Sequence, residues 1–153
     1  MVDYGLKEKV ALVTGANNPQ GIGAAIALAF AKEGACVVLV YKRILRAFDA
    51  SKTGENGTDR YFAANAGNAD EVEASLKAIN ADYLIIESDI TSEDAVKDIY
   101  AQAIQRFGKV DILVNNAADG DMDGIDTIES ITRDVIDSTF AVNVRGSIMM
   151  IHE

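Results

Sequence analysis

The chain has 153 residues, of which 49% are apolar and 25% charged, and its 24 acidic and 14 basic side chains give a formal net charge of −10. These proportions are typical of one folded domain and exclude a disordered chain, and no apolar run approaches the roughly 18 residues of a membrane-spanning helix. The acidic excess repels phosphate backbones and anionic lipids, so neither nucleic acid nor a membrane is expected as a partner.

The single cysteine, Cys36, excludes a disulfide framework, and its apolar neighbours predict that it packs as a small hydrophobic residue. Residues 1–9 carry acids and lack an apolar core, which does not fit a signal peptide. We therefore expect a cytoplasmic protein.

The N-terminal part of the chain predicts a β-α-β unit. Residues 10–14 are a short, β-rich apolar run that ends at Gly15, and residues 21–34 have a helical pattern closed by Gly34. A second continuous apolar run follows at residues 37–41. Such runs are typical of strands that are buried on both faces of a parallel sheet.

The next segment, residues 42–68, contains Gly54, Gly57 and Gly67 among scattered polar residues. It shows no sustained hydrophobic periodicity. We therefore predict a mostly irregular excursion here, apart from a turn around residues 44–48.

Strands and helices alternate through the rest of the chain. Periodicity predicts a helix over residues 69–81, with Val72, Leu76 and Ile79 on one face, and a strand over residues 83–86. A further helix is predicted over residues 91–108. It has a cap at Thr91 or Ser92, a terminal Gly108 and the apolar residues Val96, Ile99, Ala103, Ile104 and Phe107.

A fourth strand is expected over residues 110–115, followed by an acidic loop at residues 119–124 and a mainly helical stretch from residue 130 onward. Right-handed crossovers turn such an alternation into a parallel sheet with helices on both faces. We therefore predict an α/β fold with a Rossmann-like, doubly wound sheet. Residues 1–153 would form one domain, an incomplete version of this fold with its first four strands and their helices.

Three glycines, Gly15, Gly21 and Gly23, follow the first strand and open the first helix. A bound pyrophosphate needs close approach of the backbone and amide groups at a helix start, and glycines remove the obstructing Cβ atoms. Glycines also serve plain turns, but the strand-loop-helix context favours a dinucleotide-binding loop.

Residues 14–23, Thr-Gly-Ala-Asn-Asn-Pro-Gln-Gly-Ile-Gly, resemble the T-G-x-x-x-G-x-G turn of the short-chain dehydrogenase/reductase family, with two additional residues in the loop. Asp89, followed by Ile90, resembles the family's adenine-contacting acid. Residues 115–118, Asn-Asn-Ala-Ala, resemble its N-N-A-G motif, and Asn143 falls at the position of the asparagine in its catalytic tetrad.

The resemblance covers nearly all of this sequence but only the first part of the family's fold. It implies a catalytic role for Asn143, for which surface placement is the alternative, and homodimers or homotetramers formed through the last helix. It also implies a set of cofactor-binding residues, namely Thr14, Gly15, Asn17, Asn18, Gly21, Ile22, Gly23, Asp89, Ile90, Asn116, Ala117 and Ala118.

The end of the second strand predicts which nicotinamide cofactor is bound. A carboxylate at this position binds the ribose hydroxyls of NAD(H) and repels the 2′-phosphate of NADP(H). This chain has Tyr41 there, followed by Lys42 and Arg43, which can pair with a phosphate. The alternative is that Lys42 and Arg43 are only a solvated basic pair. However, the carboxylate that would favour NAD(H) is absent as well. We predict that all three residues contact the cofactor and that NADP(H) is preferred over NAD(H).

Members of the family use a tyrosine as acid/base, a lysine four residues later and a substrate-positioning serine. None of the five tyrosines in this chain has a lysine four residues later. We expect a truncated piece, inactive alone, of an oxidoreductase that reduces a carbonyl or oxidises an alcohol, of the 3-oxoacyl or the polyol and sugar class. A natural module that binds NADP(H) without catalysis is the alternative. An unrelated active site is not favoured, because no metal-ligand or nucleophile-base pattern is visible.

Overall fold

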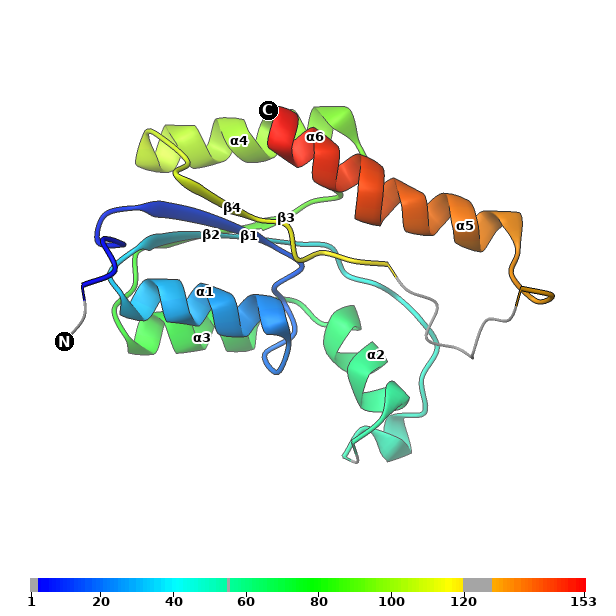
Figure 1. Cartoon of the computed structure of the whole chain (residues 1–153). Coiled ribbons are helices and arrows are strands. Elements are labelled where there is room, and N and C mark those ends of the chain that lie inside the picture. Colours follow the sequence, from blue (N-terminus) through cyan, green and yellow to red (C-terminus); the bar gives the residue numbers. More distant parts are fainter. Residues whose placement is uncertain (1–2, 55, 120–127) are drawn as a thin grey trace.

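The computed structural model describes residues 3–54, 56–119 and 128–153 (Figure 1). Its centre is a parallel four-stranded sheet with the strand order β3-β2-β1-β4. The strands are β1 (Val10–Thr14), β2 (Cys36–Tyr41), β3 (Tyr83–Glu87) and β4 (Ile112–Val114). All four predicted strands and the doubly wound α/β class are confirmed, although β4 is shorter than residues 110–115.

Helices cover both faces of the sheet (Figure 1). On one face, α1 (Ile22–Lys32) and α3 (Asp70–Ala78) pack against Val13, Val37 and Leu39. On the other face, α4 (Glu93–Phe107) packs against Leu12 and Val38. Successive strand residues therefore enter opposite cores, which explains why the strand sequences are continuous apolar runs without alternation.

The C-terminal stretch is helical, as predicted, but it is not one regular helix. It consists of α5 (Arg133–Phe140), a π-helical turn η2 (Ala141–Gly146) and α6 (Ser147–His152). A π-helical turn adds one residue to the local helical turn and is frequent near functional sites. Asn143 lies within this turn.

The prediction of an irregular excursion over residues 42–68 was wrong for its second part. The structure has a short 3-10 turn, η1 (Ala50–Lys52), and a helix, α2 (Thr58–Ala66), while residues 42–49 run without a turn. The helix was missed because Phe62 is its one buried residue, so it lacks a sustained apolar face. In Figure 1, α2 lies apart from the α1 and α3 layer, beyond the carboxyl ends of the strands.

The helices predicted over residues 69–81 and 91–108 are confirmed as α3 and α4, with small differences in which side chains are exposed. Ser92 caps α4 by accepting a hydrogen bond from the Ala95 amide, and Gly108 ends it in a left-handed conformation. Ile79 and Ile104 were expected on apolar faces, but they are 37% and 52% exposed. Ile79 is exposed because α3 ends one residue earlier.

The predicted acidic loop at residues 119–124 falls, except for Asp119, outside the described residues. In the part of the chain that the structure describes, none of the helices combines the length and apolarity needed to cross a membrane.

Candidate functional site

A cavity of about 750 Å³ opens at the carboxyl ends of the strands. In open parallel sheets, ligands bind in the crevice outside these strand ends. The cavity brings together fourteen of the fifteen predicted cofactor-binding residues: Thr14, Gly15, Asn17, Asn18, Gly21, Ile22, Tyr41, Lys42, Arg43, Asp89, Ile90, Asn116, Ala117 and Ala118. The fifteenth, Gly23, lies directly beneath the loop, where it is buried.

Packing requires two glycines at the junction of β1 and α1: Gly15 in the connecting loop of residues 15–21, here called the glycine loop, and Gly23 in the first turn of α1. Gly15 has a φ of +68°, and a Cβ atom added there would lie 2.7 Å from the Cα of Ala117. A Cβ on Gly23 would lie 2.6 Å from both the Gly15 carbonyl oxygen and the side-chain nitrogen, Nδ2, of Asn116. The glycines therefore let the loop, the start of α1 and the end of β4 meet closely. Because the first turn of α1 contains no acid, its free amide groups present an unopposed site for an anion.

Hydrogen bonds tie the glycine loop to the end of β4. The buried hydroxyl of Thr14 accepts hydrogen bonds from the backbone amides of Asn116 at 3.1 Å and Ala117 at 3.0 Å. The side-chain amide of Asn116 donates in return to the carbonyls of Thr14 and Gly15, both at 2.9 Å. The two predicted motifs thus form one connected structure beneath the cavity.

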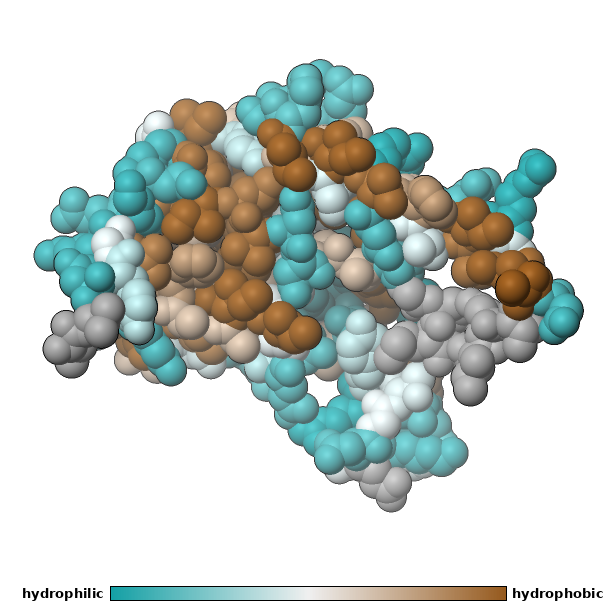
Figure 2. Space-filling view, viewed as in Figure 1, coloured by the Kyte–Doolittle hydropathy of each residue, from teal (hydrophilic) through white to brown (hydrophobic). Residues whose placement is uncertain are grey.

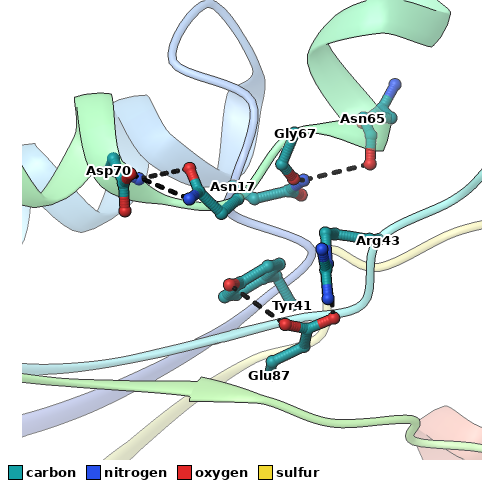
Figure 3. Close-up of polar contacts among 8 residues, drawn as sticks. Asn17, Tyr41, Arg43, Asn65, Gly67, Asp70 and Glu87 are labelled. Carbon is teal, nitrogen blue, oxygen red and sulfur yellow. Dashed lines mark hydrogen bonds and ion pairs between the residues drawn. The ribbon is translucent and has the colours of Figure 1, made fainter.

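The asparagines in the enlarged loop have different surroundings. Asn17 is only 4% exposed, and its side-chain nitrogen donates to the carbonyls of Asn65 at 3.2 Å and Gly67 at 2.9 Å (Figure 3). Asn18 is less buried and accepts a hydrogen bond from the backbone amide of Gln20. The side-chain nitrogen of Asn17 therefore anchors the end of α2 to the glycine loop.

Asn17→Ala is expected to lower the free energy of unfolding by about 1–2 kcal/mol, because two carbonyls lose their donor at a buried position. It should also loosen α2, which limited proteolysis followed by mass spectrometry can detect. Asn18→Ala is the matched control, since it removes only a hydrogen bond within the loop. Equal protease resistance of α2 in both variants would contradict the anchoring role of Asn17.

The part of the cavity at the carboxyl ends of β2 and β3 combines basic and acidic side chains. Lys42 binds Asp89 with its Nζ 2.6 Å from Oδ2, and Arg43 donates from Nε to Glu87 at 2.8 Å. The Tyr41 hydroxyl donates to the other oxygen of Glu87 at 3.4 Å (Figure 3). Burial and the neighbouring charge of Glu87 raise the pKa of Tyr41. The predicted basic pair is therefore already paired with carboxylates.

Asp89 is held firmly in place. One carboxylate oxygen accepts hydrogen bonds from the backbone amide and the hydroxyl of Thr91, and the other binds Lys42. Burial alone raises the pKa of Asp89, but the hydrogen bonds from Lys42 and Thr91 outweigh it and hold that pKa below its usual value. The carboxylate stays ionised next to the cavity.

Asn143 does not line the cavity but braces the loop that does. Its side-chain oxygen accepts from the Asp119 amide at 2.7 Å, and its side-chain nitrogen donates to the Asp119 carbonyl at 2.9 Å. Both bonds reach from the π-helical turn to the residue that follows Ala118. The adjacent Gly146 is buried against Ile90, where an added Cβ would lie 3.0 Å from the Ile90 side chain. The π-helical turn is thus packed closely against the segments that follow β3 and β4.

Sequence reasoning missed the contribution of the excursion to the cavity wall, which includes Ile44, Leu45, Arg46, Tyr61, Phe62 and Asn65. The guanidinium of Arg46 lies 5.5 Å from the ring centroid of Phe62 and 3.3 Å from the Asp119 carboxylate. It therefore connects the excursion to the loop after β4. A nine-residue, alanine-rich stretch bounded by Gly57 and Gly67 was the available signal for the helix.

Two family models match the chain. The model described as short chain dehydrogenase covers residues 50–153, and the model described as enoyl-(acyl carrier protein) reductase covers residues 15–84. Versicolorin reductase stcU of Emericella nidulans is 33% identical over 151 residues, which are 99% of this chain and 47% of that protein. D-threitol dehydrogenase of Mycolicibacterium smegmatis is 33% identical over 150 residues, which are 97% of this chain and 46% of that protein.

Solved structures show the same likeness. A short-chain dehydrogenase/reductase from Serratia marcescens superposes with a TM-score of 0.72 at 30% identity, covering 96% of this chain and 49% of that one. A putative short-chain dehydrogenase/reductase from Burkholderia xenovorans gives a TM-score of 0.74 at 26% identity, covering 96% and 50%. The chain spans about half the length of the curated relatives it matches.

Proposed function

Because this chain belongs to the short-chain dehydrogenase family, we propose that it is the cofactor-binding part of an NADP(H)-dependent oxidoreductase acting on a carbonyl or an alcohol. The observation that carries this proposal is the cavity at the strand ends, which is bordered by the glycine loop and the start of α1. When bound, a nicotinamide cofactor supplies the hydride or accepts it.

The residues around the cavity fit such a cofactor. The amides at the start of α1 would hold the pyrophosphate, because the first turn of this helix contains no acid. Gly15 and Gly21, which line the cavity, let the loop pack closely against Ala117 and Asn18. Asp89 and Ile90 would border the adenine. Residues 116–118 would border the rest of the cofactor, and Asn143 would support them through its two hydrogen bonds to Asp119.

The preference for NADP(H) rests on the end of β2. Tyr41 stands where a carboxylate would bind the ribose hydroxyls of NAD(H), and Lys42 and Arg43 follow it along the cavity. A guanidinium can bind a phosphate with two parallel hydrogen bonds. These features support NADP(H). The carboxylates of Asp89 and Glu87 already pair with both cations, which reduces the expected difference in affinity between NADP(H) and NAD(H).

We also propose a substrate class for the whole protein. We assign it to the 3-oxoacyl or the polyol and sugar class. One relative is a D-threitol dehydrogenase, which supports a polyol, and one matching model is described as enoyl-(acyl carrier protein) reductase, which supports an acyl substrate. A non-catalytic module that binds NADP(H) is the second candidate. It applies if the tyrosine-lysine pair, which these 153 residues do not contain, is absent from the full gene product as well.

We also propose that the protein assembles into a homodimer or homotetramer. Apolar side chains run along α5 and α6 on the surface (Figure 2), among them Ile136 at 41% exposure, Phe140 at 61% and Ile148 at 59%. A contiguous apolar surface of this kind is typical of an interaction site. Sedimentation of the full gene product would measure the assembly state.

Calorimetry with NADPH and NADH tests the cofactor proposal. We expect NADPH to bind about tenfold more tightly than NADH, as the net effect of one additional phosphate contact. Equal affinity for the two would overturn the preference, and binding of neither would overturn the cofactor site itself. In the full gene product, NADPH oxidation that depends on an added carbonyl compound separates the enzyme from the non-catalytic module.

A further inference from the structure

The carboxylate of Glu87 lies next to the residues on which the cofactor preference depends. Glu87 ends β3 and pairs in parallel register with Tyr41, which ends β2. It accepts hydrogen bonds from Nε of Arg43 at 2.8 Å and from the Tyr41 hydroxyl at 3.4 Å (Figure 3). Tyr41 and Arg43 line the cavity, and Glu87 contacts both without lining it.

Charge at this end of the cavity is balanced. Lys42 and Arg43 carry two positive charges, and their partners Asp89 and Glu87 carry two negative charges. A 2′-phosphate brings roughly −1.5 to −2 charges, so its binding depends on positive charge that is not already compensated. The ribose hydroxyls of NAD(H) carry no charge and do not depend on it.

The two carboxylates differ in how firmly they are held. Asp89 is fixed by the amide and hydroxyl of Thr91 as well as by Lys42, so its charge belongs to the structure of the loop. Among the described side chains, Glu87 has hydrogen bonds only to Arg43 and Tyr41, and its side chain is 42% exposed. Within the described residues, the terminal guanidinium nitrogens of Arg43 have no hydrogen-bond acceptor and are available to a phosphate.

The following inference rests on the proposed function. We propose that Glu87 is a specificity-determining residue. Because its carboxylate compensates the positive charge of Arg43, it weakens the binding of NADP(H) relative to that of NAD(H). The residue acts from the neighbouring strand, at a position that does not touch the cofactor. Glu87 therefore reduces the difference in affinity by which Lys42 and Arg43 favour NADP(H) over NAD(H).

Glu87→Gln in the full gene product tests this role, because glutamine keeps the shape and an acceptor oxygen for Arg43 but removes the charge. We expect the Kd for NADPH to fall about fivefold to tenfold and the Kd for NADH to change by less than about twofold. The gain should shrink at high salt, since the groups are partly exposed.

Glu73→Gln is the matched control. Glu73 also binds a cation and a tyrosine, with Lys77 at 2.9 Å and the Tyr83 hydroxyl at 2.8 Å, but none of the three lines the cavity. It removes the same unit of charge and should leave both Kd values unchanged. An unchanged NADPH to NADH ratio in Glu87→Gln, or a weaker binding of NADPH, would overturn the inference while the cofactor proposal stands. A parent protein that binds neither cofactor would overturn both.

Discussion

Gly23→Ala is expected to lower the free energy of unfolding by about 3 kcal/mol, although it adds a single methyl group. The new Cβ would lie 2.6 Å from the Gly15 carbonyl oxygen and 2.6 Å from the Asn116 side-chain nitrogen. These two atoms are hydrogen-bonded to each other at 2.9 Å, so neither can move away alone. The glycine loop, the start of α1 and the end of β4 would have to shift together.

The same shift should weaken NADPH binding by about tenfold or more, because the loop amides leave the positions that face the anion. Urea unfolding measures the stability, and calorimetry measures the affinity. Gly54→Ala serves as control, since Gly54 has no atom within 4 Å of an added Cβ and should be neutral or slightly stabilised. If both variants unfold at the same urea concentration, the close packing at Gly23 is not what requires glycine there.

The sheet and the cavity at its edge could be predicted because they depend on local, repeated signals. Strands buried on both faces read as continuous apolar runs, and Thr14 to Gly23 carries the glycines at the point where a strand turns into a helix. Fourteen of the fifteen predicted cofactor-binding residues line one cavity because the carboxyl ends of parallel strands meet at one edge. The local sequence patterns and the sheet topology therefore both predict a site at the carboxyl ends of the strands.

The second half of the excursion could not be predicted in this way. Helix α2 buries only Phe62, and what holds it in place is distant in sequence: Asn17 binds its last turn, and Arg46 covers the ring of Phe62. A short helix held by such contacts has little periodic signal of its own. Its position over the cavity follows from tertiary contacts rather than from its own sequence.

The charges at the ends of β2 and β3 show a second limit of prediction from the sequence. Lys42 and Arg43 stand out in the sequence as a basic pair, but Glu87 is more than forty residues away. The two meet because β2 and β3 are neighbours in the sheet and Tyr41 pairs with Glu87. A count of local charges overestimates the free positive charge, since pairing depends on strand order and register.

Thr14→Val is expected to lower the free energy of unfolding by about 2–4 kcal/mol, despite its nearly identical shape. The Thr14 hydroxyl accepts hydrogen bonds from the Asn116 and Ala117 amides and donates to the Val114 carbonyl at 3.4 Å. One hydroxyl has two acceptor sites and one donor, so all of its capacity is used. Valine would leave two backbone amides without a partner beneath the cavity.

Thr14→Ser separates the hydroxyl from the methyl group. Serine keeps all three hydrogen bonds and loses one buried methyl, so we expect a cost of only about 1 kcal/mol. Valine keeps the methyl and loses the hydrogen bonds, and because residues 116–118 would then separate from β1, it should also weaken NADPH binding. A serine variant that unfolds at a lower urea concentration than the valine variant would show that Thr14 contributes mainly through apolar packing. A serine variant that matches the parent in NADPH affinity, beside a weakened valine variant, would assign the role to the hydroxyl, which joins the glycine loop to the end of β4.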